Sequence, residues 1–133
     1  MKNILILLSI LLILQSCNPM RRIDMKNRSG GDVEITWKLQ DRDSIYKSDF
    51  FISNSDELSF EINPGETNDV KMTFGVGNWK PAALYAVTER LESLEIKSPS
   101  GTILLKSPDD IYNFLINRRR GLTNRRIVIE IID

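Results

Sequence analysis

The sequence predicts a mainly β protein, either an antiparallel β-sandwich or an α+β sheet, of about eight strands with one or two covering helices. Apolar and polar residues alternate through most of the chain after residue 22, turn-forming residues separate these segments, and helical periodicity is confined to the second half. The 133 residues provide one hydrophobic core and therefore one domain.

The first predicted element is a hairpin. Ile23 and Met25 precede a turn cluster at residues 27–32, and apolar residues then alternate with polar ones over residues 33–39. An apolar face and a polar face are typical of paired antiparallel strands with one side in water. Trp37 falls on the apolar face, which predicts that its ring packs in the core.

Two further hairpins are predicted by turn chemistry. Residues 58–62 and 70–76 alternate on either side of Asn63-Pro64-Gly65-Glu66, whose Pro and Gly suit the two central positions of a type II turn. Residues 94–96 and 103–105 flank a Ser-Pro-Ser-Gly turn at 98–101. An extra strand is expected at 50–53, and the aliphatic residues 127–132 around Glu130 predict a central strand covered on both faces.

One helix is well signalled at residues 108–120. Ser107 suits the N-cap and Pro108 the first turn, while Asp109 and Asp110 complement the positive end of the helix dipole. Arginines 118–120 complement the negative end, and Gly121 is suited to end the helix. Residues 81–91 fit a helix through Leu84, Val87 and Leu91, but part of this segment also alternates like a strand.

The N-terminus is predicted to be an export signal. A basic start is followed by an apolar run at residues 4–14 that only Ser9 interrupts. A bilayer-spanning helix needs about 20 apolar residues, so this run fits a signal-peptide core instead. The bulky Leu14 disfavours cleavage by the ordinary signal peptidase.

Leu14-Gln15-Ser16-Cys17 resembles the lipobox of bacterial lipoproteins. The resemblance implies cleavage before Cys17 and lipid attachment to this residue, so residues 1–16 are the expected cleaved signal and residues 17–22 the acylated cysteine and short tether. It covers only these first residues, and the single β-rich domain at 23–133 is predicted from the strand pattern. Asn18 stands where the family's inner-membrane retention signal carries Asp, so the expected location is the cell envelope, at the outer membrane. Residues 18–22 contain no acid, which favours the periplasmic face. A free cysteine after an ordinary signal is the alternative.

Composition restricts the chemistry. The 18 basic and 18 acidic residues leave no net field that favours nucleic acid, and the chain has no histidine for Ser-His-Asp or Cys-His catalysis. The acidic segment 41–57 does not match a calcium loop, and Glu89, Glu92 and Glu95 fit the solvent face of a helix. We therefore predict no catalytic residue, metal or cofactor.

Two features remain as possible ligand contacts. Five arginines lie within nine residues and could bind phosphates of lipid A or a polyanionic glycan: Arg118, Arg119, Arg120, Arg125 and Arg126. Helix-end and strand-flanking roles already explain all five, and we favour these structural roles. If 118–120 are helical, their side chains point 100° apart rather than to one face. Trp79 follows a glycine-rich bend, where its ring can pack on the sheet edge or stack on a sugar.

These observations predict a lipid-anchored envelope protein with a non-catalytic binding or scaffolding domain, held to the membrane by the anchor at Cys17. The expected partner is an envelope protein or glycan, contacted at the edge of the sandwich. A small glycan-binding or glycan-hydrolysing envelope protein is the alternative. Arg21 and Arg22 are expected either at the lipid headgroups or in a solvated linker.

Overall fold

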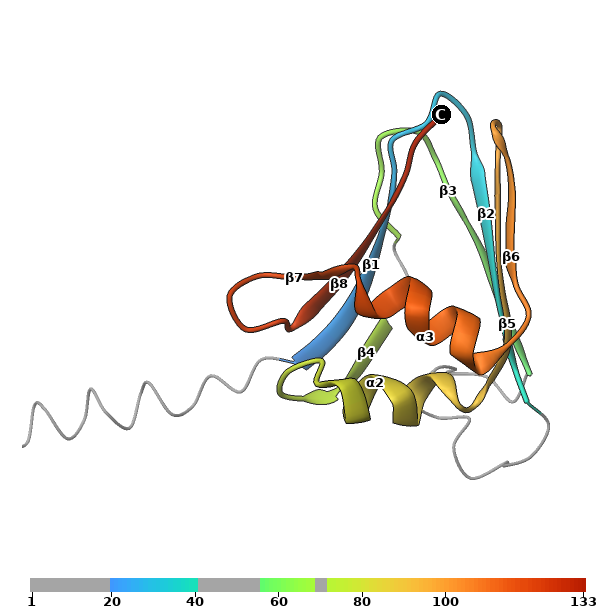
Figure 1. Ribbon diagram of the computed structural model, residues 1–133. Helices are drawn as coiled ribbons and strands as arrows, with labels where there is room; N and C mark the ends of the chain where they lie inside the picture. Colours follow the sequence, from blue (N-terminus) through green and yellow to red (C-terminus); the bar gives the residue numbers. More distant parts are fainter. Residues whose placement is uncertain (1–19, 41–55, 69–71) are drawn as a thin grey trace, which may run out of the picture.

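The computed structural model describes residues 20–40, 56–68 and 72–133. Within these residues the chain forms eight strands in two four-stranded sheets, together with two helices (Figure 1). The prediction of a mainly β, sandwich-like fold is confirmed. The first sheet, sheet A, has the order β4-β1-β8-β7, with β4 at Met72–Val76, β1 at Met20–Asn27, β8 at Arg126–Ile131 and β7 at Arg119–Arg120.

Sheet B has the order β3-β2-β5-β6, with all neighbouring strands antiparallel. Its strands are β3 at Glu57–Ile62, β2 at Val33–Leu39, β5 at Leu91–Ser98 and β6 at Gly101–Leu105. The two sheets meet at one end of the molecule and diverge toward the other, where helices α2 (Pro81–Thr88) and α3 (Pro108–Ile116) cover the opening (Figure 1). Helix α3 contacts both β5 and β8, so it bridges the two sheets.

The core lies between the sheets and beneath the helices. Every second residue of β1, β2 and β8 is buried, which is the period of a strand with one face toward the core. The fully buried side chains come from both sheets and both helices and include Ile23, Met25, Ile35, Trp37, Ile62, Trp79, Leu84, Leu94, Ile111, Leu115 and Ile127.

The first predicted hairpin is wrong, because β1 and β2 belong to different sheets. Their buried residues face one another across the core instead of lying side by side, and the alternation is the same in both arrangements. The buried Asn27 stabilises this corner: its amide nitrogen donates to the carbonyls of Gly31 and Ile62, both at 2.7 Å. Its side-chain oxygen accepts from the N–H of Ser29 at 2.9 Å.

The second predicted hairpin is also wrong, since β3 lies in sheet B and β4 in sheet A. The turn itself has the expected form, because Gly65 has φ 81° and the N–H of Glu66 donates to the carbonyl of Asn63 at 3.1 Å. The third hairpin is confirmed: β5 and β6 pair directly through Ser98 and Gly101. The strand predicted at 50–53 lies outside the described residues.

Strand β8 is central, as predicted, but only its inner face is covered. It lies between β7 and β1, and its pairing with β1 is parallel, so sheet A is not purely antiparallel. Ile127, Ile129 and Ile131 are buried, whereas Glu130 is exposed and Ile132, just beyond the strand, is 65% exposed. No layer of the described residues covers the outer face of this sheet.

The helices differ from prediction in their ends. Ser107 caps α3 by accepting the N–H of Asp110 at 3.1 Å, as expected, but the helix ends at Ile116 rather than at residue 120. The following residues pair with β8 instead, because the N–H of Val128 donates to the carbonyl of Arg118 and Arg120 faces Arg126. The segment 81–91, for which the sequence left helix and strand open, is a helix at residues 81–88 and becomes a strand at Leu91.

The domain also begins earlier than predicted. Strand β1 starts at Met20, so Arg21 and Arg22 lie in sheet A rather than in a tether of residues 17–22. Arg22 pairs with Arg126 in register, and Arg21 donates from Nε to the carbonyl of Phe74 at 2.7 Å. Among the described residues, no helix is long and apolar enough to span a membrane.

Candidate functional site

The end of α3 decides how the arginine cluster is arranged. Because residues 119–120 form strand β7, consecutive side chains alternate between the two faces of sheet A, unlike residues of a helix. Arg118 and Arg120 therefore lie on the outer face, while Arg119 turns inward and donates to the carbonyls of Ile116 and Trp79, each at 2.9 Å. The helical assumption, which separated these side chains by 100°, is wrong.

A hollow of about 410 Å³ on the outer face of sheet A brings four basic side chains together. We call this site the basic hollow, and its lining consists of Lys26, Arg118, Arg120, Arg126, Val128, Glu130 and Ile132. Two carboxylates moderate its charge. Glu130 accepts from Nε of Arg28 at 3.1 Å, and Asp24 accepts from Nε of Arg126 at 2.9 Å. The basic side chains outnumber these acids, so the hollow is electropositive.

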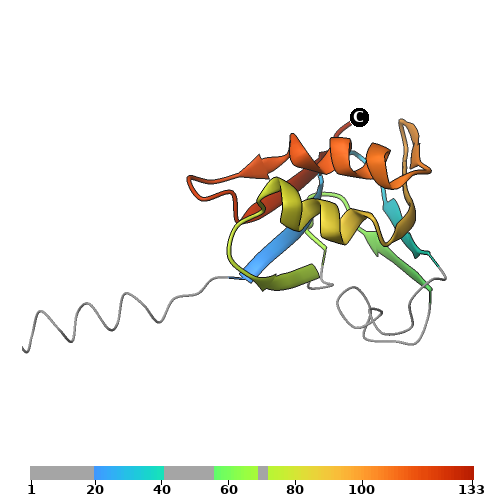
Figure 2. The ribbon, with the colours of Figure 1, turned by 60° about the horizontal axis from the view of Figure 1, so that its bottom comes forward.

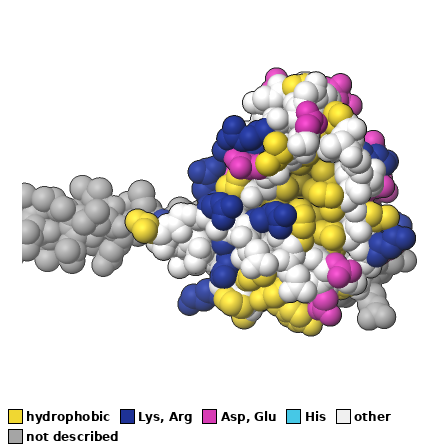
Figure 3. Space-filling model, turned by 45° about the horizontal axis from the view of Figure 1, so that its top comes forward, with side chains coloured by type: hydrophobic (Ala, Val, Ile, Leu, Met, Phe, Trp, Pro, Cys, Tyr) yellow, Lys and Arg dark blue, Asp and Glu magenta, His cyan; other side chains and the backbone are white. Residues whose placement is uncertain are grey.

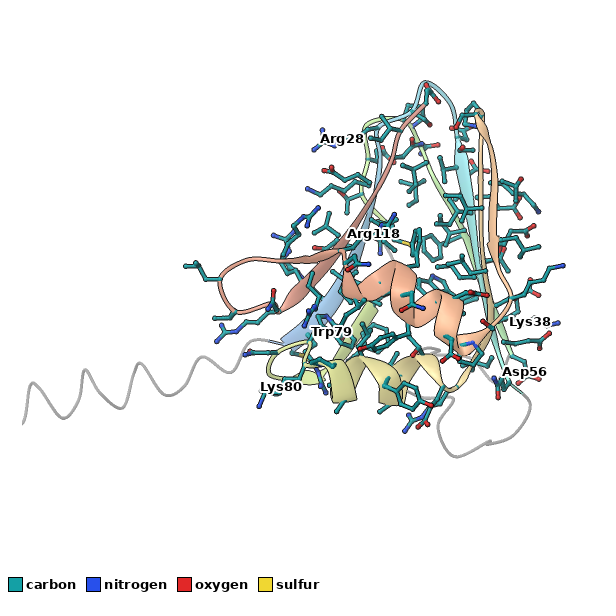
Figure 4. The ribbon with its side chains drawn as sticks, viewed as in Figure 1. Arg28, Lys38, Asp56, Trp79, Lys80 and Arg118 are labelled. Carbon is teal, nitrogen blue, oxygen red and sulfur yellow. The ribbon has the colours of Figure 1, made fainter. Side chains whose placement is uncertain are left out.

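Arg118 is the most constrained of these cations. Its guanidinium carbon lies 3.7 Å from the centroid of the Phe114 ring, and Nη1 donates to the carbonyl of Phe114 at 2.6 Å. Figure 4 shows the side chain beside the C-terminal end of α3. Burial, and then the neighbouring charge of Arg120, lower the pKa of Arg118 from its ordinary value. An arginine still keeps its charge at neutral pH, so Arg118 presents a fixed cation that an anion would stabilise.

An apolar groove of about 430 Å³ adjoins the basic hollow. It runs between β6 and the C-terminal half of β8, and its apolar lining comprises Ile96, Ile103, Phe114, Ile129, Ile131 and Ile132. Arg118, Glu130 and Ile132 line both the groove and the hollow. Figure 3 shows apolar surface in the middle of the face, next to the Lys and Arg side chains that gather along one side.

Two sheet edges form the sides of this groove. Strand β7 pairs with β8 only at Ile127 and Arg126, so within the described chain no strand covers that side of β8 from Ile129 onward. On the opposite side, β6 is the edge strand of sheet B, and its Ile103 and Leu104 are exposed. The sandwich is thus open along one edge, with apolar side chains at the opening.

Trp79 is not available to stack on a sugar. Its side chain is fully buried, with Nε1 donating to the carbonyl of Arg22 at 3.2 Å and its ring centroid 5.3 Å from that of Phe74. The glycine-rich bend turns the ring into the core instead of exposing it, since Gly75 and Gly77 both adopt positive φ. The packing interpretation of Trp79 is confirmed, and its alternative as an exposed glycan platform is wrong.

The remaining arginines have different environments. Arg126 lies in the basic hollow and Arg125 outside it, with the carbonyl of Arg125 accepting from the N–H of Arg22 at 3.1 Å. Three of the five predicted arginines therefore converge. Lys26 was missed, because its place beside Arg118 depends on the parallel pairing of β1 with β8, which no local pattern signals.

The candidate carboxylates do not form a site. Glu89 ends α2, whereas Glu92 and Glu95 lie in β5, so the helical face predicted for them is wrong. Glu92 accepts from Lys38 at 3.1 Å, and Glu95 lies 3.3 Å from Nζ of Lys97. In the described ranges, no three metal-ligating side chains come together. Cys17 and most of the acidic segment, residues 41–55, lie outside those ranges.

No protein-family model, curated protein or solved structure matches this chain.

Proposed function

We propose that this chain is a lipid-anchored protein of the bacterial cell envelope, with a non-catalytic domain that binds an anionic amphiphile. The lipobox-like residues Leu14 to Cys17 support the anchor, which would be an acylated Cys17 at the outer membrane. The observation that carries the binding role is the direct junction of the basic hollow with the apolar groove.

The chemistry of the ligand is inferred from this junction. A phosphate or carboxylate group fits beside Arg118 and Arg120, because guanidinium groups offer several donors in a fixed plane. The groove between β6 and β8 would take the apolar part of the same molecule, removing exposed isoleucine side chains from water. A polyanionic glycan satisfies the charge, and its hydroxyls suit Ser98, Ser100 and Thr102 of the groove, but it has no apolar part to cover the exposed Ile103 and Ile132, so a phosphate-bearing lipid is the better match.

A soluble chain of residues 18–133 can test binding, because it retains all of β1 and every core residue that the structure describes. We expect dihexanoyl phosphatidic acid to shift the amide resonances of Lys26, Arg118 and Ile103. The variant Arg118→Gln/Arg120→Gln should bind roughly a hundredfold more weakly, because each charge-assisted contact is worth about 1.5 kcal/mol or more. The control Lys38→Gln/Lys97→Gln removes two charges from sheet B and should bind normally.

The apolar half of the proposal has its own control. Ile103→Ser should weaken binding of the lipid without changing the response to inorganic phosphate, since this side chain lines the groove and not the basic hollow. Equal affinity for inorganic phosphate and for the lipid would mean that the groove contributes nothing. If neither the lipid nor inorganic phosphate bound, the proposed site would be contradicted altogether.

A further inference from the structure

Three segments of the chain meet at one end of sheet A. Strand β1 begins there at Met20, β4 ends there at Val76, and these two residues are paired. Because β8 runs parallel to β1 and antiparallel to β7, the turn at 121–125 lies at the same end. Figures 1 and 2 both show the β7–β8 turn on the same side of the molecule as the start of β1.

This end combines protruding apolar side chains with basic ones. Leu122 at the tip of the β7–β8 turn is 106% exposed, and Met20 and Val76 are 48% and 53% exposed. The exposed basic residues around them are Arg22, Lys80, Arg120 and Arg126. We call these seven residues the tether-end surface. The nearby acid is Asp24, and Arg126 and Arg22 contact it at 2.7 and 3.4 Å.

The β7–β8 turn is held firmly in place. The N–H of Trp79 donates to the carbonyl of Asn124 at 2.8 Å, and Nη1 of Arg119 donates to the carbonyl of Trp79 at 2.9 Å. Within the turn, the N–H of Asn124 donates to the carbonyl of Gly121 at 3.2 Å. The buried Trp79 thereby ties the turn to the bend after β4, and Leu122 projects from a supported backbone.

We propose that the tether-end surface docks on the anionic lipid bilayer that holds the chain's own anchor. This inference rests on the proposed acylation of Cys17. Cys17 lies three residues before Met20, so their Cα atoms are at most about 11 Å apart. So short a connection puts this end of sheet A at the bilayer surface, where apolar side chains enter the acyl boundary and basic ones meet anionic headgroups.

The test uses the full, processed chain reconstituted into vesicles. Cys17 is the sole cysteine of the sequence and would be blocked by its lipid, so Thr123→Cys supplies a single reactive thiol next to Leu122. Asp32→Cys is the control position, because it follows the opposite end of β1, about 25 Å away at about 3.3 Å per residue. Each thiol carries an environment-sensitive fluorophore, and lipid-borne nitroxide serves as quencher.

We expect the label at 123 to be quenched, and the label at 32 to remain unquenched, in vesicles of equal parts phosphatidylcholine and phosphatidylglycerol. Quenching at 123 should decrease in pure phosphatidylcholine and be lost when Leu122→Ser is added. The matched change Leu104→Ser, on the exposed face of β6, should leave it intact.

Intact mass of the reconstituted protein separates the two proposals. Acylated protein whose label at 123 is no more quenched than that at 32 would overturn the docking surface and leave the anchor standing. Protein without acyl mass would overturn the anchor and the docking proposal that rests on it. Quenching that is equal with and without phosphatidylglycerol would overturn the role of the basic residues.

Discussion

Removal of the Trp79 side chain is expected to destabilise the domain severely. The ring is fully buried, and truncating a buried Trp to Ala costs about 3–5 kcal/mol in lost burial and residual cavity. The Nε1 hydrogen bond to Arg22 adds about 1 kcal/mol, and the Arg21 guanidinium, 5.5 Å from the ring centroid, adds about 0.5–1 kcal/mol. Since these contributions overlap, we expect Trp79→Ala to lower the free energy of unfolding by about 4–6 kcal/mol.

Urea titration of residues 18–133 measures this loss, with the fluorescence of Trp37 as the probe. For a slope of about 1–2 kcal/mol per molar urea, the midpoint should fall by at least about 2 M. Trp79→Phe keeps most of the ring but loses the N–H donor, so it should cost about 1–2 kcal/mol. Trp37→Ala, followed by the fluorescence of Trp79, should cost as much as Trp79→Ala, because both rings are fully buried.

A loss below about 1 kcal/mol for Trp79→Ala would refute this reasoning, because it would mean that the ring is not packed in the core. A Trp79→Phe variant as unstable as Trp79→Ala would also contradict it, since the hydrogen bond would then outweigh the burial of the ring.

Three further changes test separate parts of the structure. Asn27→Ala should cost about 2–4 kcal/mol in urea titrations, because it removes the amide that donates to the Ile62 carbonyl and the oxygen that accepts the N–H of Ser29, while the Gly31 carbonyl keeps the Ser29 hydroxyl at 3.0 Å; a loss within error would mean that water replaces the amide. Arg119→Gln should lower stability by about 1–3 kcal/mol without weakening lipid binding, whereas Arg118→Gln should weaken lipid binding and also lose the contacts of Arg118 with Phe114; equal effects on binding would contradict their placement on opposite faces. Cys17→Ser should abolish labelling by palmitate and leave the signal peptide uncleaved, and undiminished labelling would rule out this attachment site.

The sequence by itself determined the local structure. Ser107 and Pro108 specified where α3 begins, because a cap and a restricted φ act within one helical turn. The Ser98–Gly101 turn specified the β5–β6 hairpin, and alternation identified the buried face of β2. Each of these features depends on residues a few positions apart.

Apart from the β5–β6 hairpin, the pairing of strands depended on the tertiary structure. The alternation of apolar and polar residues in β1 and β2 is the same whether the two strands form a hairpin or lie in opposite sheets of a sandwich. Two tertiary features place them in different sheets: the corner at Asn27, and the pairing of β1 with β8 across about a hundred residues of chain. The pairing of β7 with the start of β8 ended α3 early and placed Arg118 and Arg120 on one face, and the pairing of β1 with β8 brought Lys26 beside them. Strand partners are selected by the burial of the whole apolar surface, and this quantity is not encoded in any short segment.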